Sequence, residues 1–237
     1  MPTPVNGGIY SGIAAMDSAQ RRLEAITSNL ANLSSTGYKR LSTSTQSFQA
    51  SLRGKLEPQI STRTVLDFSQ GVLGNTGNPY DLALHGSGFF AVETSEGEVY
   101  TRNGQFRVDA EGLLQTIEGY PVAWDGARGT IDPLGVEVSV DEEGLVRQGD
   151  VEVGRLRIVD FEETGRLEFD RKGFYHASGS MRETTSTAVV RQGTLEGANV
   201  SAVDEMVAMI ATQRSFESAS KLMQTIEQSY RRLTRAR

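Results

Sequence analysis

The sequence contains no cysteine, which excludes disulfide bonds, thiolate nucleophiles and zinc sites with cysteine ligands. It also lacks any run of about 18 consecutive apolar residues, the length that a transmembrane helix needs. The opening residues, MPTPVNGGIYSG, do not show the basic, apolar and small-residue order of a secretory signal. If the chain leaves the cytoplasm, we expect an export route without a cleavable signal peptide.

Histidine is scarce as well. Only His85 and His176 are present, and neither has a second histidine at metal-ligand spacing. The acidic runs Asp141-Glu142-Glu143 and Glu162-Glu163 precede glycines, so solvated turns explain them better than general acid-base catalysis does. Gly86-Ser87-Gly88 lacks the third glycine or the Lys-Ser/Thr of a phosphate-binding loop. We therefore expect no enzyme, and no metal, cofactor or small-molecule site.

Charge is unevenly distributed along the chain. The net charge is -6, and residues 61–190 hold 22 acidic against 11 basic residues, so both ends are mildly basic. The basic residues of the ends are mixed with acidic ones and form no dense Lys/Arg face with stacking aromatics. We expect no nucleic-acid partner and no membrane insertion.

Near the amino terminus, apolar and small residues recur at alternating spacings of three and four, the pattern of a coiled-coil seam. We expect a coiled-coil helix within residues 1–38, and Gly37 follows the last seam position as a left-handed helix cap. The seam positions are Ile9, Gly12, Met16, Ala19, Leu23, Ile26, Leu30 and Leu33.

A second apolar pattern predicts a coiled-coil helix within residues 197–237. Its spacing slips near Phe216, which changes the local supercoil or the partner. Each helix alone is marginal in water, so we expect the two ends to pair with each other, with copies or with another protein, and to order mainly on assembly. The apolar positions are Met206, Met209, Phe216, Ala219, Met223, Ile226, Tyr230 and Leu233.

Between the helices, glycine recurs beside Asn, Asp, Glu or Thr and separates short alternating runs. This texture predicts an antiparallel all-β domain over residues 71–196. Residues 39–70 show no clear period and are expected to form an extended linker. The expected fold class is α+β, with the terminal helices forming a coiled-coil layer. The expected strands cover residues 89–93, 99–102, 105–108, 113–117, 136–140, 151–161 and 187–190.

Three stretches resemble the flagellar rod and hook protein family. Residues 29–40, NLANLSSTGYKR, are similar to its amino-terminal signature, with Ser35 where the family usually has Thr. Residues 81–90, DLALHGSGFF, and residues 100–104, YTRNG, are similar to its central motifs. Residues 192–200, QGTLEGANV, resemble its carboxy-terminal element, with Ala198 in place of the usual Ser.

The resemblance implies a structural subunit of the bacterial flagellar basal-body rod. Such a subunit is exported unfolded through the flagellar type III apparatus and packs with copies of itself and with other rod proteins into an axial tube across the periplasm. The compact stretch between Arg40 and Gln70 is most similar to the proximal-rod protein, and a distal-rod or hook-type subunit is the alternative. A comparable element docks to the export gate, which nominates Phe48 and Leu52, although a short packed turn explains these two residues equally well.

Several residues then receive expected roles. Asn29 and Asn32 lie on a helix despite their poor helix propensity. Either they bond locally to the backbone near Gly37, or their amides fix register between subunits, and the resemblance favours register. Gly86, Gly88 and Gly104 are expected at backbone turns. The seam residues of both helices, from Ile9 to Leu33 and from Met206 to Leu233, are expected to form the assembly interface.

Two rival functions remain at this stage. A secreted, oligomeric adhesin or glycan-binding module predicts exposed aromatics in a ligand groove, for which Trp124 and Tyr120 are the nearest pair. A carboxylate hydrolase acting on cell-wall glycan predicts one indispensable acidic pair, and no pair stands out.

Overall fold

The computed structural model describes residues 4–52, 55–170, 173–177 and 181–235. The side chains of residues 4–11, 45–52, 55–61, 230 and 233–235 lie outside the described part. The chain divides into two compact units. Unit 1 contains the residues up to Leu33, Arg40–Asp67 and the residues from Val200 onward, and unit 2 contains Ser34–Lys39 and Phe68–Asn199.

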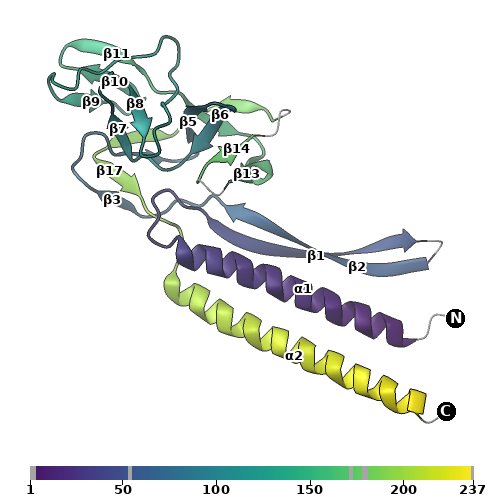
Figure 1. Cartoon of the computed structure of the whole chain (residues 1–237). Coiled ribbons are helices and arrows are strands. Elements are labelled where there is room, and N and C mark those ends of the chain that lie inside the picture. Colours follow the sequence, from purple (N-terminus) through teal and green to yellow (C-terminus); the bar gives the residue numbers. More distant parts are fainter. Residues whose placement is uncertain (1–3, 53–54, 171–172, 178–180, 236–237) are drawn as a thin grey trace. The chain divides into compact units, whose positions relative to one another are not determined.

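Unit 1 consists of two long helices and a β-hairpin. Helix α1 spans Pro4–Ala31 and helix α2 spans Ala202–Arg235. Strands β1, Arg40–Leu52, and β2, Lys55–Asp67, form the hairpin. Figure 1 shows α1 between the hairpin and α2, with the start of α1 beside the end of α2, so the two helices are antiparallel. The helices therefore pair within one chain.

The hairpin corrects the expectation of an extended linker over residues 39–70. Its strands pair antiparallel without interruption from Arg40 opposite Asp67 to Leu52 opposite Lys55. In this stretch polar residues often follow one another directly instead of alternating with apolar ones, so the sequence shows no period of two. A two-stranded hairpin is marginal in water by itself, and its packing on α1 adds stability that the local sequence does not reveal.

Phe48 and Leu52 both belong to strand β1 rather than to a packed turn. Their side chains lie outside the described residues.

Gly37 has the expected left-handed backbone, with φ of +69°, but it does not cap α1. The helix already ends at Ala31. Asn32 directs both its backbone N–H and its side-chain Nδ2 to the Ser28 carbonyl, at 3.1 and 2.9 Å. A side-chain amide that bonds the helix backbone competes with continuation of the helix, so termination comes before the glycine.

Unit 2 is an antiparallel β domain, which confirms the expected fold class at the level of α+β. Its sheets are β13-β14-β6-β5-β12-β15, β11-β10-β9, β16-β4, β17-β3 and β7-β8. A 3-10 turn, Thr164–Arg166, precedes β13. The strands are β3 Leu73–Asn75, β4 Leu82–His85, β5 Phe89–Thr94, β6 Gly97–Thr101, β7 Phe106–Val108, β8 Leu114–Thr116, β9 Val138–Val140, β10 Leu145–Gln148, β11 Val151–Arg155, β12 Ile158–Phe161, β13 Glu168–Phe169, β14 Tyr175–His176, β15 Glu183–Thr185, β16 Val189–Gln192 and β17 Thr194–Glu196.

The core of unit 2 is aromatic and aliphatic. Phe89 and Phe90 are buried at the start of β5, directly after the turn that Gly86 and Gly88 make with φ of +109° and +149°. These two glycines therefore lie directly before a buried strand. Trp124 lies in the same core as Phe90.

The exposed aromatic pair that the adhesin hypothesis needs is therefore absent from the described residues. Trp124 is buried in the core of unit 2. Tyr120 packs edge-on against Phe174, with ring centroids 5.5 Å apart. No helix in the described ranges combines the length and the apolar character that crossing a bilayer requires.

Candidate functional site

The two helices of unit 1 meet along the seam that α1 was expected to present. Ala19 and Ile26 are buried, and Ala19 lines a hollow together with Ala211 and Thr212 of α2. At Gly12 an added Cβ atom would lie 2.5 Å from Met223 Sδ, so the glycine lets α2 approach closely. The α1 seam is thus used inside the chain, against α2.

The other predicted interface residues divide into three groups. The first group is half-buried in unit 1. The second is exposed: Leu33, beyond the end of α1, is 36% exposed and Met206 is 55% exposed. Ile9, Tyr230 and Leu233 belong to the two helices, but their side chains lie outside the described residues. The half-buried residues are Met16, Leu23, Leu30, Met209, Phe216, Met223 and Ile226.

Met206 belongs instead to an apolar stripe on the opposite face of α2. Four residues with spacings of three, one and three lie on one side of an α-helix, and their exposed fractions are between 52% and 70%. We call them the α2 stripe: Val203, Met206, Val207 and Ile210. This pattern is present in the sequence. It was missed there because the helix was expected to have a single apolar face.

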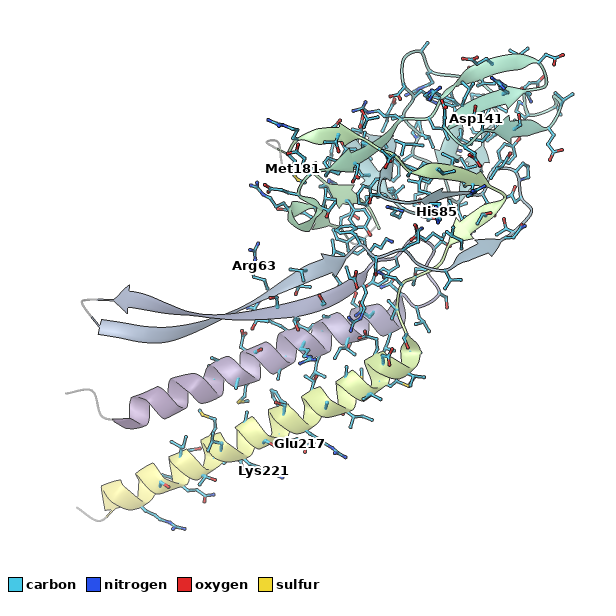
Figure 2. All side chains as sticks on the ribbon, turned by 180° about the vertical axis from the view of Figure 1, so that it is seen from behind. Arg63, His85, Asp141, Met181, Glu217 and Lys221 are labelled. Atoms are coloured by element: carbon cyan, nitrogen blue, oxygen red, sulfur yellow. The ribbon has the colours of Figure 1, made fainter. Side chains whose placement is uncertain are left out.

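The same face of α2 becomes charged beyond the stripe. Glu217 and Lys221 lie on the side of α2 away from α1 in Figure 2. Both residues lie on the same face of α2 as the stripe, at the spacing of successive helix turns. The apolar character of this face is therefore confined to the first turns of α2.

A groove opens between the first half of α1 and the last turns of α2. Ile13 and Met16 of α1 line it together with Met223 and Ile226 of α2, and its volume is about 610 Å³. Ile13 is 52% exposed there. We call this hollow the helix groove; its remaining lining residues are Ser220, Gln224 and Glu227.

Asn29 makes a buried polar contact in unit 1. Its side chain is fully buried, Oδ1 accepts a hydrogen bond from Leu41 N and Nδ2 donates to Leu41 O, each at 2.8 Å. The amide therefore joins α1 to the start of β1. This corrects the hypothesis of a register bond between subunits, because the burial places these bonds within the chain. Asn32 makes the local bond to Ser28 described above.

The start of α2 is held by a second polar contact. Ser201 precedes the helix, and its Oγ accepts a bond from Asp204 N at 3.4 Å. Glu205 is fully buried, and its Oε1 lies 2.5 Å from Arg40 Nε. An acidic residue in the first turn also complements the helix dipole. Arg40 and Glu205 thus join β1 to α2 within unit 1.

Unit 2 contains a buried ionic cluster that we call the junction triad: Lys39, Arg102 and Glu196. Lys39 Nζ lies 2.7 Å from Glu196 Oε1, and Arg102 Nη1 lies 3.2 Å from Glu196 Oε2. The three side chains are between 0% and 4% exposed. A buried carboxylate with two cationic partners is strongly coupled to them, because little water screens the charges.

Further hydrogen bonds stabilise the triad, although the buried Arg102 Nε has no hydrogen-bond partner among the described residues. Lys39 Nζ donates to the Ser69 carbonyl at 2.7 Å, and Gly71 N donates to Glu196 Oε1 at 2.8 Å. Arg102 Nη2 donates to the Gly86 carbonyl at 2.7 Å. Burial lowers the pKa of the Arg102 guanidinium, and the neighbouring Glu196 carboxylate opposes that shift.

The triad lies where the chain passes between the two units. Lys39 directly precedes β1, Ser69 and Gly71 follow β2, and Glu196 lies shortly before α2. Gly37 N also donates to the Glu196 carbonyl at 2.7 Å. Residues next to three of the four places where the chain leaves unit 2 therefore meet in one cluster.

The three residues of the junction triad belong to the family motifs, but the sequence alone predicted no role for them. Lys39 belongs to TGYK, Arg102 to YTRNG and Glu196 to QGTLEG. The available clue is that each motif places one charged residue among glycines and uncharged residues. Charge of opposite sign in three such motifs favours a shared buried contact.

The acidic turn at Asp141-Glu142-Glu143 has a structural role. Asp141 Oδ1 accepts bonds from Glu143 N and Leu145 N, each at 2.9 Å. Glu142 and Glu143 pair with Arg191 and Arg155, each at 3.1 Å. These exposed ion pairs join the β9–β10 connection to strands β16 and β11.

The chain matches three family models in order. Residues 9–39 match the model described as flagella basal body rod protein. Residues 83–148 match the flagellar hook protein FlgE/F/G D1 domain, and residues 191–236 match the flagellar basal body rod FlgEFG protein C-terminal model.

Individual relatives cover nearly the whole chain. It is 34% identical to the flagellar basal-body rod protein FlgF of Caulobacter vibrioides, over 92% of this chain and 93% of that protein. It is 32% identical to FlgF of Escherichia coli K12, over 92% and 93%. It is also 31% identical to the flagellar basal-body rod protein FlgG of Buchnera aphidicola from Schizaphis graminum, over 92% and 95%.

Proposed function

This chain belongs to the flagellar basal-body rod protein family, and from that premise we propose that it is a structural subunit of the rod that joins its neighbours through the helices of unit 1. The observation that carries the proposal is the α2 stripe. It stays exposed although α1 covers the opposite face of α2. A contiguous exposed apolar face marks an interaction surface.

The proposed arrangement has two layers. Helices α1 and α2 form the inner layer as a coiled coil, and the acidic β domain, residues 71–196, forms the outer layer. Apolar burial stabilises contacts by roughly 25 cal/mol per Å². Large apolar helix contacts at the inner radius therefore suit a shaft that transmits torque for motility.

The partners are copies of the chain and other rod or axial proteins of the basal body. We place it in the proximal rod, because residues 40–67 form only one hairpin and leave no room for a longer insert. The proposed route is export, unfolded, through the flagellar type III apparatus into the periplasm. Phe48 and Leu52 remain candidates for docking to the export gate.

Replacing Val207 and Ile210 together by Asp tests the proposal. Both are exposed on α2, so the substitutions leave the α1–α2 contact intact, whereas an apolar contact with a neighbour is lost. We expect a strain with this variant to lose motility and to contain no assembled rod beyond the subunit. Glu217→Gln with Lys221→Gln is the matched control on the same helix face and keeps motility. Normal motility of the Asp variant would refute a role of this face in assembly.

The helices are also proposed to order fully only on assembly. Amide hydrogen exchange on the purified monomer tests this point. Exchange of α1 and α2 that is at least tenfold faster than that of β4 and β5 supports ordering on assembly, since the helices are buried along one face only. Equal protection of helices and strands in the monomer contradicts it.

A further inference from the structure

We infer that the α2 stripe of one copy docks into the helix groove of a second copy, so that successive copies join head to tail. This inference rests on the proposed function and specifies which surfaces meet. It names a second copy of this chain as the occupant of the groove.

The helix groove is an incompletely filled part of the α1–α2 interface. Four apolar side chains from both helices line its floor, and its volume of about 610 Å³ holds several aliphatic side chains. Ile13 leaves half of its surface exposed there. Because lining atoms without neighbours lose dispersion contacts, packing a third helix into the groove stabilises both helices beneath it.

The α2 stripe has the shape and the chemistry to fill that groove. It presents Met206 and three β-branched residues over two turns of α2, and a ridge of side chains spaced by three and four fits between two helices. The groove likewise extends over about two turns of α2, from Ser220 to Glu227. The two surfaces therefore match in length and polarity.

The two surfaces are separated along the helix, and this separation sets the geometry of the contact. The stripe starts at Val203 and the groove at Ser220, about 17 residues apart, which is roughly 25 Å at 1.5 Å per residue. A contact between different patches of identical copies is heterologous, and it grows as an open helix unless the rotation closes. Each copy is thus displaced by roughly 25 Å along the helix direction.

One pair of opposite charges agrees with this displacement when neighbouring α2 helices are parallel. Asp204 beside the stripe then comes level with Lys221 of the next copy. Arg214 lies one turn beyond the stripe and comes level with Arg231 of the next copy, which is paired with Glu227 in its own chain. A stripe-to-stripe contact would instead form a closed dimer, oppose Asp204 to its own copy and leave the groove empty.

Site-directed crosslinking decides between these arrangements, and the cysteine-free sequence makes it clean. The variant Met206→Cys/Ile13→Cys carries one thiol in the stripe and one in the groove. Within one chain these positions are roughly 25 Å apart by the same helix rise, too far for a short bismaleimide. We expect crosslinking in basal bodies purified from motile cells to give a ladder of dimers and higher multimers.

Single variants and a matched pair serve as controls. Met206→Cys alone and Ile13→Cys alone should remain monomeric, and Glu217→Cys/Ile13→Cys should give at least tenfold less multimer. If Met206→Cys/Ile13→Cys does not enter basal bodies, the second pair Val207→Cys/Gln224→Cys tests the same contact.

The outcomes separate this inference from the proposed function. Subunits that assemble without stripe-to-groove crosslinks, or Met206→Cys subunits that crosslink to each other, overturn the head-to-tail contact and leave the rod assignment intact. Absence of the unmodified chain from purified basal bodies overturns both.

Discussion

Lys39 and Glu196 are 157 residues apart in the sequence, yet Lys39 Nζ lies 2.7 Å from Glu196 Oε1, and neither side chain is more than 1% exposed. Their contact closes unit 2, because one residue lies before its first strand and the other at the end of its last. The same carboxylate holds Arg102. Unit 2 can therefore reach its final stability only after almost the whole chain is present.

Replacing Glu196 by Gln should destabilise unit 2 by about 3–5 kcal/mol, since it leaves two buried cations without a counter-charge. Lys39→Met should cost less, because the Arg102–Glu196 pair survives. Denaturant unfolding followed by Trp124 fluorescence measures both. Glu142→Gln, which breaks only an exposed pair with Arg191, is the control and should cost under about 1 kcal/mol. Equal losses for Glu196→Gln and Glu142→Gln would contradict a buried ionic cluster.

Asn29→Ala should destabilise unit 1 by about 2–3 kcal/mol. It removes two hydrogen bonds to Leu41 and leaves a buried backbone N–H and C=O to find other partners. We expect faster amide exchange at Leu41 in particular. Asn32→Ala is the comparison, because its bond to Ser28 is local and partly exposed, and it should cost about half as much or less. A larger effect at Asn32 than at Asn29 would show that the α1–β1 contact is not the important one.

The helices could be predicted from the sequence because their signals are local. The seam from Gly12 to Ile26 repeats every three or four residues, so it predicts both the helix and the face that α2 covers. The hairpin at residues 40–67 could not be predicted in this way, because its support comes from packing on α1. The α2 stripe was hidden because Met206 and Met209 also fit a single seam.

The β domain was predicted as a class but not strand by strand. Glycine turns such as Gly86 to Gly88 are visible locally, whereas residues 151–161, expected as one strand, divide into β11 and β12 at Leu156 and Arg157. Strands of two or three residues, such as β13 and β17, carry too few positions to show a period. The junction triad depends on contacts over more than 90 residues, which no local pattern encodes.

Gly104→Ala should destabilise unit 2 by at least about 2 kcal/mol, since overpacking forces backbone shifts. A Cβ atom at this position would lie 1.6 Å from the Leu82 carbonyl oxygen. The two backbone segments are also joined by a hydrogen bond, in which Leu82 N donates to the Gly104 carbonyl at 3.0 Å. Gly165→Ala is the matched control, because nothing lies within 4 Å of the added methyl group. Thermal unfolding of the two variants compares them directly, and a stability of Gly104→Ala equal to that of Gly165→Ala would argue against this close approach.

Tyr175 and Tyr100 should make the protein sensitive to alkaline pH. Burial raises the pKa of both phenols well above the usual value, which is about 10 in an unfolded chain. Below about pH 10 both states keep the proton and stability is unaffected. Above it the unfolded chain releases protons that the folded chain retains, so stability falls by up to about 1.4 kcal/mol per pH unit for each tyrosine until the folded phenol also titrates.

Phenylalanine at either position should make this decline shallower, and the two variants should differ at pH 7. Tyr100 Oη donates to Glu183 at 2.8 Å, so Tyr100→Phe should cost about 1 kcal/mol there. The Tyr175 hydroxyl is buried and has no hydrogen-bond partner among the described residues, so Tyr175→Phe should be neutral or stabilising. Unfolding midpoints between pH 7 and 11.5, with phenolate absorbance recorded in parallel, test both points. A decline as steep in Tyr175→Phe as in the unmodified protein would show that another group causes the alkaline loss.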